Sequence, residues 1–305
     1  MSTHKKYHGI TPPIVTPLLA RDTLDIAGLE RLIEHQIAGG VAGLFILGTT
    51  GEGPSHSYRL RRELIDRTCQ FTKGRVPILV GITDTSFVES VNIACYSADS
   101  GADSLVLAPP FYIPPGQPEL VEYIDHLVPE LPIPLFLYNM PGLTKVSFEP
   151  ETVRRAMDHA RIIGLKDSSG NMIYMHRMIE LLKHRHDWTL LVGPEELLGD
   201  CVLAGGHGGV PGGANVFPRL YVDLYEAASR GDLTCTRELH AKVMQVTGKL
   251  YRLGAHTSSY IKGIKTALSL LGICDDGMAE PSQRFDTHDR NRVAVVLEEL
   301  QALIG

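Results

Sequence analysis

The residues Ile162-Ile163-Gly164-Leu165-Lys166-Asp167 form a short apolar run that ends in two charged residues. Near-continuous apolar runs of this kind are typical of strands that are buried on both faces of a parallel sheet. The chain contains seven further runs, and most of the eight start about 30 residues apart, which is the length of one strand–helix unit. The eight predicted strands are residues 14–16, 43–47, 77–81, 104–108, 134–138, 162–166, 189–192 and 208–211.

The spacing of the apolar residues changes between these runs from that of a strand to that of a helix. Clear helical faces span residues 26–37, 88–98, 153–160 and 172–182. Eight strands that alternate with helices predict an α/β fold, the (β/α)8 TIM barrel. A doubly wound sheet is the alternative, but no GxGxxG motif follows the first run to support it.

After residue 217 the helical pattern continues without a further strand, over residues 220–229, 233–253, 258–271 and 289–303. We therefore expect a single structural unit in two parts. Residues 1–217 carry the strands and helices of the barrel together with the active site. Residues 218–305 are C-terminal helices that complete and extend the barrel.

The composition of the 305 residues is that of a globular protein, with 44% hydrophobic and 21% charged residues. The formal net charge of −6 is spread along the chain, so a nucleic-acid-binding surface is not expected. No long apolar run indicates a membrane span, and residues 1–9 lack the apolar stretch of a signal peptide. The five cysteines are scattered and form no CxxC pair, which favours reduced thiols in the cytoplasm.

Lys166 is the first candidate for catalysis, because barrel enzymes place their sites at the C-terminal ends of the strands and Lys166 ends the sixth run. Burying an ammonium group is costly unless it is paired, and desolvation lowers the pKa of the lysine and favours the neutral amine. A neutral amine can form a Schiff base with a carbonyl compound. The structural alternative is a lysine whose side chain extends from the strand end to solvent.

Two other strand ends carry hydroxyl groups. Tyr138 ends the fifth run, where its hydroxyl can relay protons or, alternatively, bond a carbonyl group while the ring packs in the core. Residues 48–53, Gly-Thr-Thr-Gly-Glu-Gly, follow the second run. The amides of this segment and the hydroxyls of Thr49 and Thr50 can hold a small carboxylate, and a plain glycine turn is the alternative.

A proline-rich loop, residues 109–115, follows the fourth run and presents Phe111 and Tyr112. Proline restricts the backbone, so the loop is expected to be stiff. It can cap the site, contact another subunit or form a rigid part of the surface.

Taken together, these motifs closely resemble those of the dihydrodipicolinate synthase / N-acetylneuraminate lyase family of class I, pyruvate-dependent aldolases. The residues that carry the resemblance are Gly48-Thr49-Thr50-Gly51-Glu52, Tyr138-Asn139-Met140-Pro141 and Gly164-Leu165-Lys166-Asp167, in that order. The opening residues 9–17 and the segment 206–218 are similar as well. The resemblance extends over nearly the whole chain, from Gly9 to about Gly272.

The resemblance implies a role for each motif residue. Lys166 forms an imine with the keto carbon of pyruvate, and Tyr138 relays protons to and from the substrate. Thr49 and Thr50 bind the pyruvate carboxylate, and Thr49 joins the proton relay. The chemistry needs no metal and no other cofactor, because the imine itself activates the substrate.

The resemblance also implies an assembly. Family members are commonly homotetramers built as dimers of dimers. The aromatic residue of the loop after the fourth strand, here Tyr112, reaches the active site of a neighbouring subunit in many of them. The backbone near Val210 is expected to lie beside bound pyruvate.

Two departures from the family pattern bear on the substrate. Leu143 occupies the position where synthases generally carry an arginine for the carboxylate of the aldehyde, and an apolar side chain cannot replace a guanidinium. Gly193, Glu195 and Glu196 resemble the lyases, whose carboxylates can accept hydrogen bonds from sugar hydroxyls. We therefore expect a 2-keto-3-deoxy sugar acid, with the synthase reaction on aspartate semialdehyde as the alternative. Gly212 stands where the lyases tend to have a serine, so sialic acid itself is not assigned.

Two rival functions follow from other features. Class II aldolases use a divalent metal, and His184 and His186 are a possible ligand pair, although a solvated helix end is the simpler interpretation. A non-catalytic barrel that binds a keto acid as a sensor is the second rival, but a sensor has no need of an imine-forming lysine.

Overall fold

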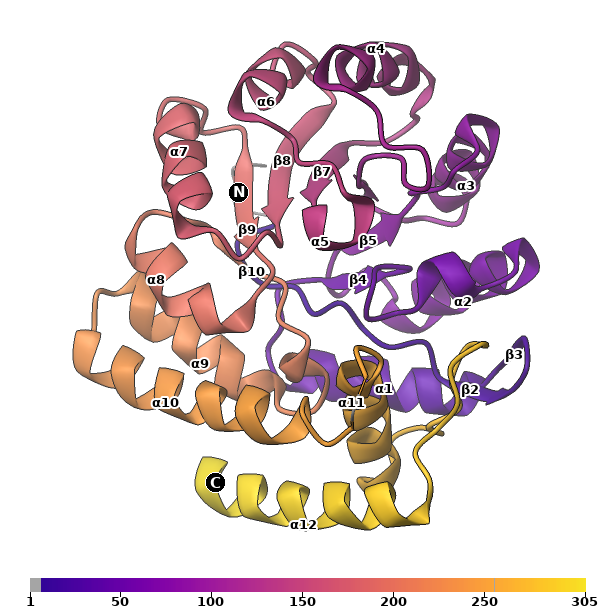
Figure 1. Cartoon of the computed structure of the whole chain (residues 1–305), viewed down its shortest axis with the longest axis vertical. Helices are drawn as coiled ribbons and strands as arrows, with labels where there is room; N and C mark the ends of the chain where they lie inside the picture. Colours follow the sequence, from indigo (N-terminus) through magenta and orange to yellow (C-terminus); the bar gives the residue numbers. More distant parts are fainter. Residues whose placement is uncertain (1–6, 255) are drawn as a thin grey trace.

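The computed structural model describes residues 7–254 and 256–305. Eight parallel strands curl into a barrel with helices around it (Figure 1), which confirms the predicted (β/α)8 fold. The strands are hydrogen-bonded in the order β1, β10, β9, β8, β7, β6, β5 and β4. Their bounds are β1 Gly9–Ile10, β4 Leu44–Ile46, β5 Ile78–Gly81, β6 Ser104–Leu107, β7 Leu135–Asn139, β8 Ile162–Asp167, β9 Thr189–Val192 and β10 Gly208–Gly209.

The first predicted strand, residues 14–16, is wrong. The strand β1 lies earlier in the chain, and only an isolated bridge between Pro13 and Phe45 joins this segment to β4 and closes the barrel. Two adjacent prolines lack the amide hydrogens that a ladder needs. Beyond them the amide of Val15 donates to the side chain of Asn215, 3.0 Å away, instead of to a strand. The other seven predicted runs overlap observed strands.

Several helices begin at a residue whose side chain caps them. The side chains of Asp25, Ser57, Ser86, Asn171 and Asp232 accept amide hydrogens at the starts of α1, α2, α3, α7 and α10. The helices of the barrel are α1 Ile26–Ala38, α2 Tyr58–Thr72, α3 Phe87–Asp99, α4 Gln117–Leu127, α5 Pro141–Thr144, α6 Pro150–Ala156, α7 Met172–Leu182, α8 Leu198–Leu203 and α9 Pro218–Ser229. A short antiparallel hairpin, β2 Leu18–Ala20 with β3 Thr23–Leu24, precedes α1.

The C-terminal helices occur where the sequence predicts them. After α9 come α10 Leu233–Leu250, α11 Ser259–Leu270 and α12 Thr287–Ile304. Figure 1 shows α10 and α12 outside the ring of barrel helices, with α11 between α12 and the barrel. Helix α10 packs on α9 and α12, so the extension is joined to the barrel through α9.

The core has two layers. The larger one lies between the strands and the surrounding helices. The smaller one fills the inside of the barrel and includes Phe45, Val106, Phe136, Tyr138 and Val210. Because side chains alternate along a strand, residues in register on neighbouring strands point the same way, and Tyr138 on β7 is in register with Lys166 on β8. The barrel therefore brings these two side chains together.

Two further observations concern the chain as a whole. Within the described residues, no helix combines the length and apolar character needed to cross a membrane. The five cysteines are free thiols, and Cys201 and Cys274 are buried. A reducing, cytoplasmic environment stays a prediction from the cysteine pattern.

Candidate active site

Lys166 lies at the C-terminal end of β8 with only 5% of its surface exposed. Its Nζ atom is 3.9 Å from the centroid of the Tyr138 ring and 4.8 Å from that of Phe45. No carboxylate of residues 7–254 or 256–305 is within ion-pairing distance of it, so the ammonium has no counter-ion there. Burial therefore lowers the pKa of Lys166 and favours the neutral, nucleophilic amine.

Lys265 on α11 provides a useful contrast, because it is also fully buried. Its Nζ atom forms an ion pair with Glu52 and donates to the carbonyl oxygen of Gly277, 2.6 Å away. The charge of Lys265 is thus neutralised by a carboxylate, whereas that of Lys166 is not. Of these two buried lysines, only Lys166 has the surroundings of an imine-forming amine.

Tyr138 is buried beside Lys166, and its hydroxyl oxygen lies 3.4 Å from the hydroxyl oxygen of Thr49. Burial alone would raise the pKa of the phenol. When Lys166 is protonated, its charge, together with hydrogen bonds from Thr49 and Ser168, outweighs burial and lowers the pKa of Tyr138. A phenol with a lowered pKa, next to an amine and a hydroxyl, is a suitable general acid and base.

The segment 48–53 folds tightly over the end of β4. The backbone has a positive φ at Leu47 and at Glu52, and a Cβ atom at Gly53 would lie 2.2 Å from the carbonyl oxygen of Leu47. Only glycine permits so close a return of the chain. The turn places Thr49 and Thr50 on the same pocket as Lys166.

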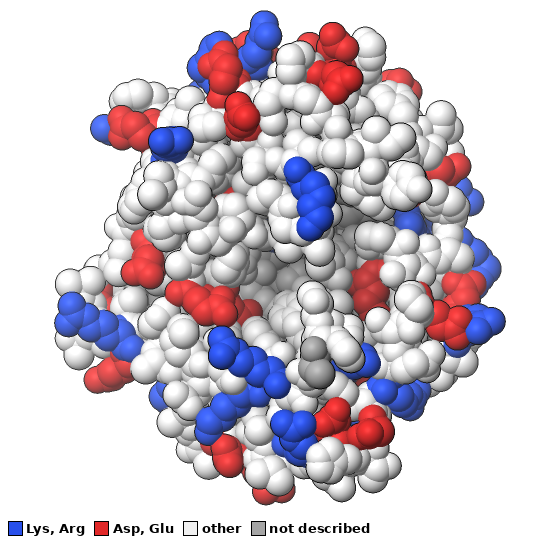
Figure 2. Space-filling view, in the orientation of Figure 1, with Lys and Arg blue, Asp and Glu red and all other residues white. Residues whose placement is uncertain are grey.

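This pocket, which we call the lysine pocket, has a volume of about 250 Å³. Besides Lys166, Tyr138 and the two threonines, the predicted residues Gly193, Val210, Glu195 and Glu196 line it. The structure thus brings together eight of the residues singled out in the sequence. Figure 2 shows the centre of this face hollowed, with charged side chains of both signs around the rim.

The sequence suggests that Glu195 accepts hydrogen bonds from a sugar, but in the structure its carboxylate has other partners. It is 4% exposed, and its carboxylate already accepts hydrogen bonds from the hydroxyls of Tyr221 and Tyr251 and from the amide of Gly213. Burial raises the pKa of Glu195. Glu196 is half-buried in the same pocket wall and makes no such set of internal bonds, so it is the carboxylate better placed for a ligand.

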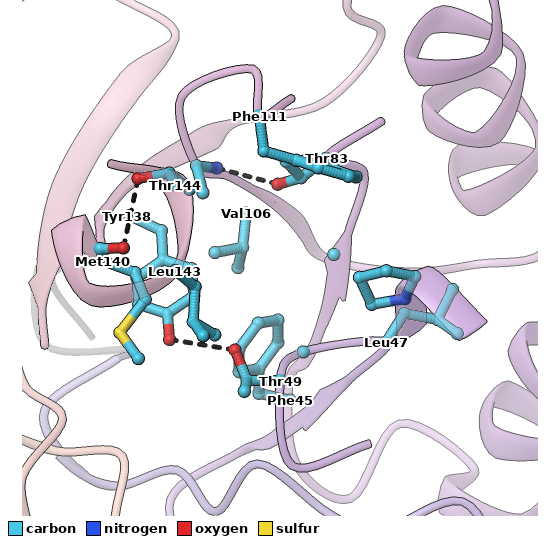
Figure 3. Close-up of a pocket in the computed structure, with 14 residues that line it drawn as sticks. Phe45, Leu47, Thr49, Thr83, Val106, Phe111, Tyr138, Met140, Leu143 and Thr144 are labelled. Atoms are coloured by element: carbon cyan, nitrogen blue, oxygen red, sulfur yellow. Dashed lines mark hydrogen bonds between the residues drawn. The ribbon is translucent and has the colours of Figure 1, made fainter. Parts of the chain in front are cut away.

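A second pocket of about 230 Å³ adjoins the first and shares Thr49, Tyr138 and Met140 with it. Its other walls are mostly apolar, so we call it the apolar pocket. Leu143 on α5 lines it (Figure 3). Within the described part of the chain, Lys166 is the only lysine or arginine that lines either pocket. A second carboxylate would therefore find no cation here.

Tyr112 does not line either pocket of its own chain. It is 91% exposed, and its φ of 77° is in the left-handed region that side chains rarely adopt. Phe111, its neighbour on the same loop, does line the apolar pocket. A role for Tyr112 in a site therefore requires a second subunit.

Two tyrosines of the lysine pocket are not expected from the sequence. Tyr251 caps the C-terminus of α10 and Tyr260 lies in the first turn of α11, and both line the pocket. They come from the C-terminal extension, where no motif marks them. Helical periodicity does not define where α11 packs against the barrel, so it does not indicate that these tyrosines reach the pocket.

The two histidines considered as metal ligands lie far from the lysine pocket. His184 and His186 are exposed in the turn between α7 and β9, at the opposite end of the strand from the pocket. In residues 7–254 and 256–305 no group of three or more histidine, cysteine, aspartate or glutamate side chains is placed to hold a metal ion.

Comparisons with known proteins agree with this arrangement. The sequence model of the dihydrodipicolinate synthetase family matches residues 6–300. A dihydrodipicolinate synthase structure from Bacteroides thetaiotaomicron is 55% identical, with a TM-score of 0.94 and coverage of 96% of this chain and 98% of the other. A probable 2-dehydro-3-deoxy-D-pentonate aldolase of Escherichia coli is 31% identical over 88% of this chain and 89% of its own length.

One solved relative contains a ligand. It is an Escherichia coli prophage protein of the dihydrodipicolinic acid synthase family in complex with pyruvate, 28% identical, with a TM-score of 0.90 and coverage of 97% of this chain and 99% of that one. The family uses a Schiff base with pyruvate and no cofactor. The chain therefore belongs to the dihydrodipicolinate synthetase family of pyruvate-dependent lyases.

Proposed function

We propose that this lyase joins pyruvate to, or releases it from, a hydroxylated aldehyde, so that the longer partner is a 2-keto-3-deoxy sugar acid. The observation that carries the proposal is that Lys166 is the only cationic side chain on the two adjoining pockets of the described chain. Lys166 is consumed by the imine, so it cannot also hold a second carboxylate. A sugar-derived chain has hydroxyls at that end instead.

The chemistry begins with the amine of Lys166, which attacks the keto carbon of pyruvate. Loss of water gives the protonated imine, whose positive nitrogen withdraws electrons from the neighbouring methyl group. Removal of a methyl proton gives an enamine, and its carbon attacks the aldehyde. The new alkoxide takes a proton, and water then releases the product and restores the amine. Cleavage follows the same steps in reverse.

We assign the proton transfers to the Tyr138 hydroxyl, supported by Thr49 at 3.4 Å. The same hydroxyl can serve several steps, because each proton that it takes in one step is returned in a later one. The hydroxyls of Thr49 and Thr50 would bind the pyruvate carboxylate, and the backbone at Val210 and Gly193 would form the facing wall. The half-buried carboxylate of Glu196 would accept hydrogen bonds from the hydroxylated chain, and the hydroxyl of Ser168 would accept or donate one.

The synthase reaction, condensation of pyruvate with aspartate semialdehyde, is the second candidate. The names of the relatives favour it, because the 55% identical structure is described as a dihydrodipicolinate synthase. The lining of the pockets argues against it, because Leu143 offers no charge to the semialdehyde carboxylate. An arginine from a partner subunit would reconcile the two.

We also propose that the chain forms a homotetramer in which Tyr112 of one subunit contacts the site of another. Support comes from the exposed, proline-flanked loop that carries Tyr112 and from the family resemblance. A side chain with 91% exposure and a strained backbone is easier to explain when another surface covers it.

The test of substrate class is a measurement of kcat/KM on aspartate semialdehyde with pyruvate and on a series of 2-keto-3-deoxy acids of four to seven carbons. The proposal expects the sugar-derived acids to be the better substrates. A natural enzyme that prefers aspartate semialdehyde would replace this proposal with the synthase. Turnover with neither class, together with imine formation from pyruvate, would direct the search to aldehydes with apolar substituents.

A further inference from the structure

Tyr260 lies on α11, a helix of the C-terminal extension, and lines the lysine pocket. Its hydroxyl oxygen lies 2.9 Å from the hydroxyl oxygen of Thr50. Of the described side chains, Thr50 is the one that bonds this hydroxyl. A phenol from the far end of the sequence thus contacts the threonine that we assign to the pyruvate carboxylate.

We propose that Tyr260 is a positioning residue for the keto-acid carboxylate and that it acts through Thr50. The inference rests on the proposed role of Thr50. A carboxylate can only accept hydrogen bonds, so Thr50 must use its single hydroxyl hydrogen as the donor to it. The hydrogen between Thr50 and Tyr260 must then come from Tyr260. By donating, Tyr260 turns the hydrogen of Thr50 toward the substrate.

The space for this phenol depends on Gly212. A Cβ atom at residue 212 would lie 1.7 Å from the hydroxyl oxygen of Tyr260 and 2.7 Å from its Cζ atom. A side chain at residue 212 and the observed position of Tyr260 therefore exclude each other. Tyr260 of α11 therefore supplies the hydroxyl in this corner of the pocket, and it can do so only because residue 212 is a glycine.

The ring of Tyr260 is held from a second side by Tyr251, with ring centroids 4.6 Å apart and an angle of 85° between the planes. The hydroxyl of Tyr251 donates to Glu195, 2.7 Å away. The same carboxylate accepts the amide of Gly213, next to Gly212, at 2.9 Å. Glu195 thus fixes both walls of the space in which Tyr260 lies, which keeps its hydroxyl aimed before substrate binds.

The experiment measures pyruvate affinity alone, so it does not depend on the unknown aldehyde. Enzyme is incubated with increasing pyruvate and reduced with borohydride, and mass spectrometry gives the trapped fraction. Tyr260→Phe keeps the ring and removes the hydroxyl. Loss of one net hydrogen bond should raise the pyruvate concentration for half-trapping roughly 2- to 10-fold. Trapping at saturating pyruvate should stay complete.

The control is Tyr174→Phe. Tyr174 is half-buried on α7 and donates to the carbonyl oxygen of Phe148 at 2.7 Å, outside the lysine pocket. The Tyr174→Phe variant loses a similar hydrogen bond and should leave pyruvate affinity unchanged. In the Thr50→Val background, Tyr260→Phe should have no further effect, because its partner is gone.

A second variant tests the steric part. Gly212→Ala should weaken pyruvate binding when Tyr260 is present and cause no further loss in the Tyr260→Ala background. Wild-type affinity in Tyr260→Phe, or full additivity with Thr50→Val, would overturn the inference. If Thr50→Val itself leaves affinity unchanged, the assignment of Thr50 fails first, and this inference falls with it.

Discussion

Glu52 and Lys265 form an ion pair in which both side chains are buried, and the pair joins the turn after β4 to α11. The second oxygen of Glu52 accepts the amide of Ala279 at 2.8 Å. Glu52 lies two residues after Thr50, so this pair anchors the turn that carries the hydroxyls of the site. Lys166, the other buried lysine, has no such partner, and the two lysines should respond to substitution in opposite ways.

Lys265→Met should destabilise the fold by about 3–5 kcal/mol, because it leaves the Glu52 carboxylate buried without a counter-charge. Lys166→Met should leave the free energy of unfolding equal or higher, because it removes a buried ammonium that has no partner. Urea unfolding at neutral pH compares the two. A similar loss of stability in both variants would contradict the distinction between them.

The lowered pKa of Lys166 predicts a pH dependence. The unfolded chain binds the lysine proton more tightly than the folded chain, so this group's contribution to stability rises with pH and is lost as pH falls through the folded pKa. The rate of imine formation should follow the same direction, because only the neutral amine attacks pyruvate. Rates of borohydride trapping measured from pH 5 to pH 10 should level off well below the ordinary lysine pKa of about 10.4. A rate that still rises steeply near that value would contradict the prediction.

Trapping should also identify the lysine. Pyruvate and borohydride should leave a reduced adduct on a peptide that contains Lys166 and none on the peptide with Lys265. Lys166→Ala should abolish turnover, and EDTA should have no effect. An adduct on another residue would remove Lys166 from the mechanism, and activity lost to EDTA and restored by zinc would favour the metal-dependent alternative.

Tyr138→Phe removes the hydroxyl and keeps the ring that packs beside Lys166. A role as general acid and base predicts a kcat lower by roughly 10²- to 10⁴-fold, with little change in the melting temperature. Kinetics with any accepted aldehyde and a thermal melt give the two values. An unchanged kcat would leave Tyr138 with a packing role only.

Leu143→Arg should shift substrate preference. A new charge-assisted hydrogen bond contributes about 1.5–3 kcal/mol, which corresponds to roughly 10- to 150-fold in kcat/KM for aspartate semialdehyde. Leu143→Met is the matched control, because it is similar in size and carries no charge. If the arginine variant gains nothing on the semialdehyde, the carboxylate of that substrate does not reach α5.

The assembly is tested by light scattering of the wild type and of Tyr112→Ala. We expect a tetramer for the wild type and lower activity for the variant, because Tyr112 would lie at a neighbour's site. Tyr58→Phe, which alters a tyrosine hydroxyl bonded to Asp84 outside both pockets, is a control for nonspecific loss. A monomer with full activity would exclude a shared site.

The parts of the site that could be predicted from sequence are those in which one strand carries both the fold signal and the chemistry. Lys166 and Tyr138 end apolar runs, so the alternation that defines the strands also places these side chains inside the barrel. The first strand was misplaced because apolar residues alone did not account for the missing amides of Pro12 and Pro13.

The contribution of Tyr260 could not be predicted, because it depends on how α11 packs against the barrel. Helical spacing in the sequence fixes which residues share a face and leaves open which strand they meet. Glu195 lines the pocket, but its bonds to Tyr221 and Tyr251 come from helices far along the chain. Long-range contacts of this kind leave no local pattern in a single sequence.

The origin of Tyr251 and Tyr260 in the C-terminal helices has a consequence for how such enzymes diverge. The groups that we assign to imine formation and proton transfer lie on strands β7 and β8, whereas two aromatic walls of the pocket lie more than 80 residues further along. Recombination between two family genes near the codons of α9 would keep the reaction and exchange part of the pocket wall. Chimeras joined there are a direct way to transfer substrate range without changing the strand that carries Lys166.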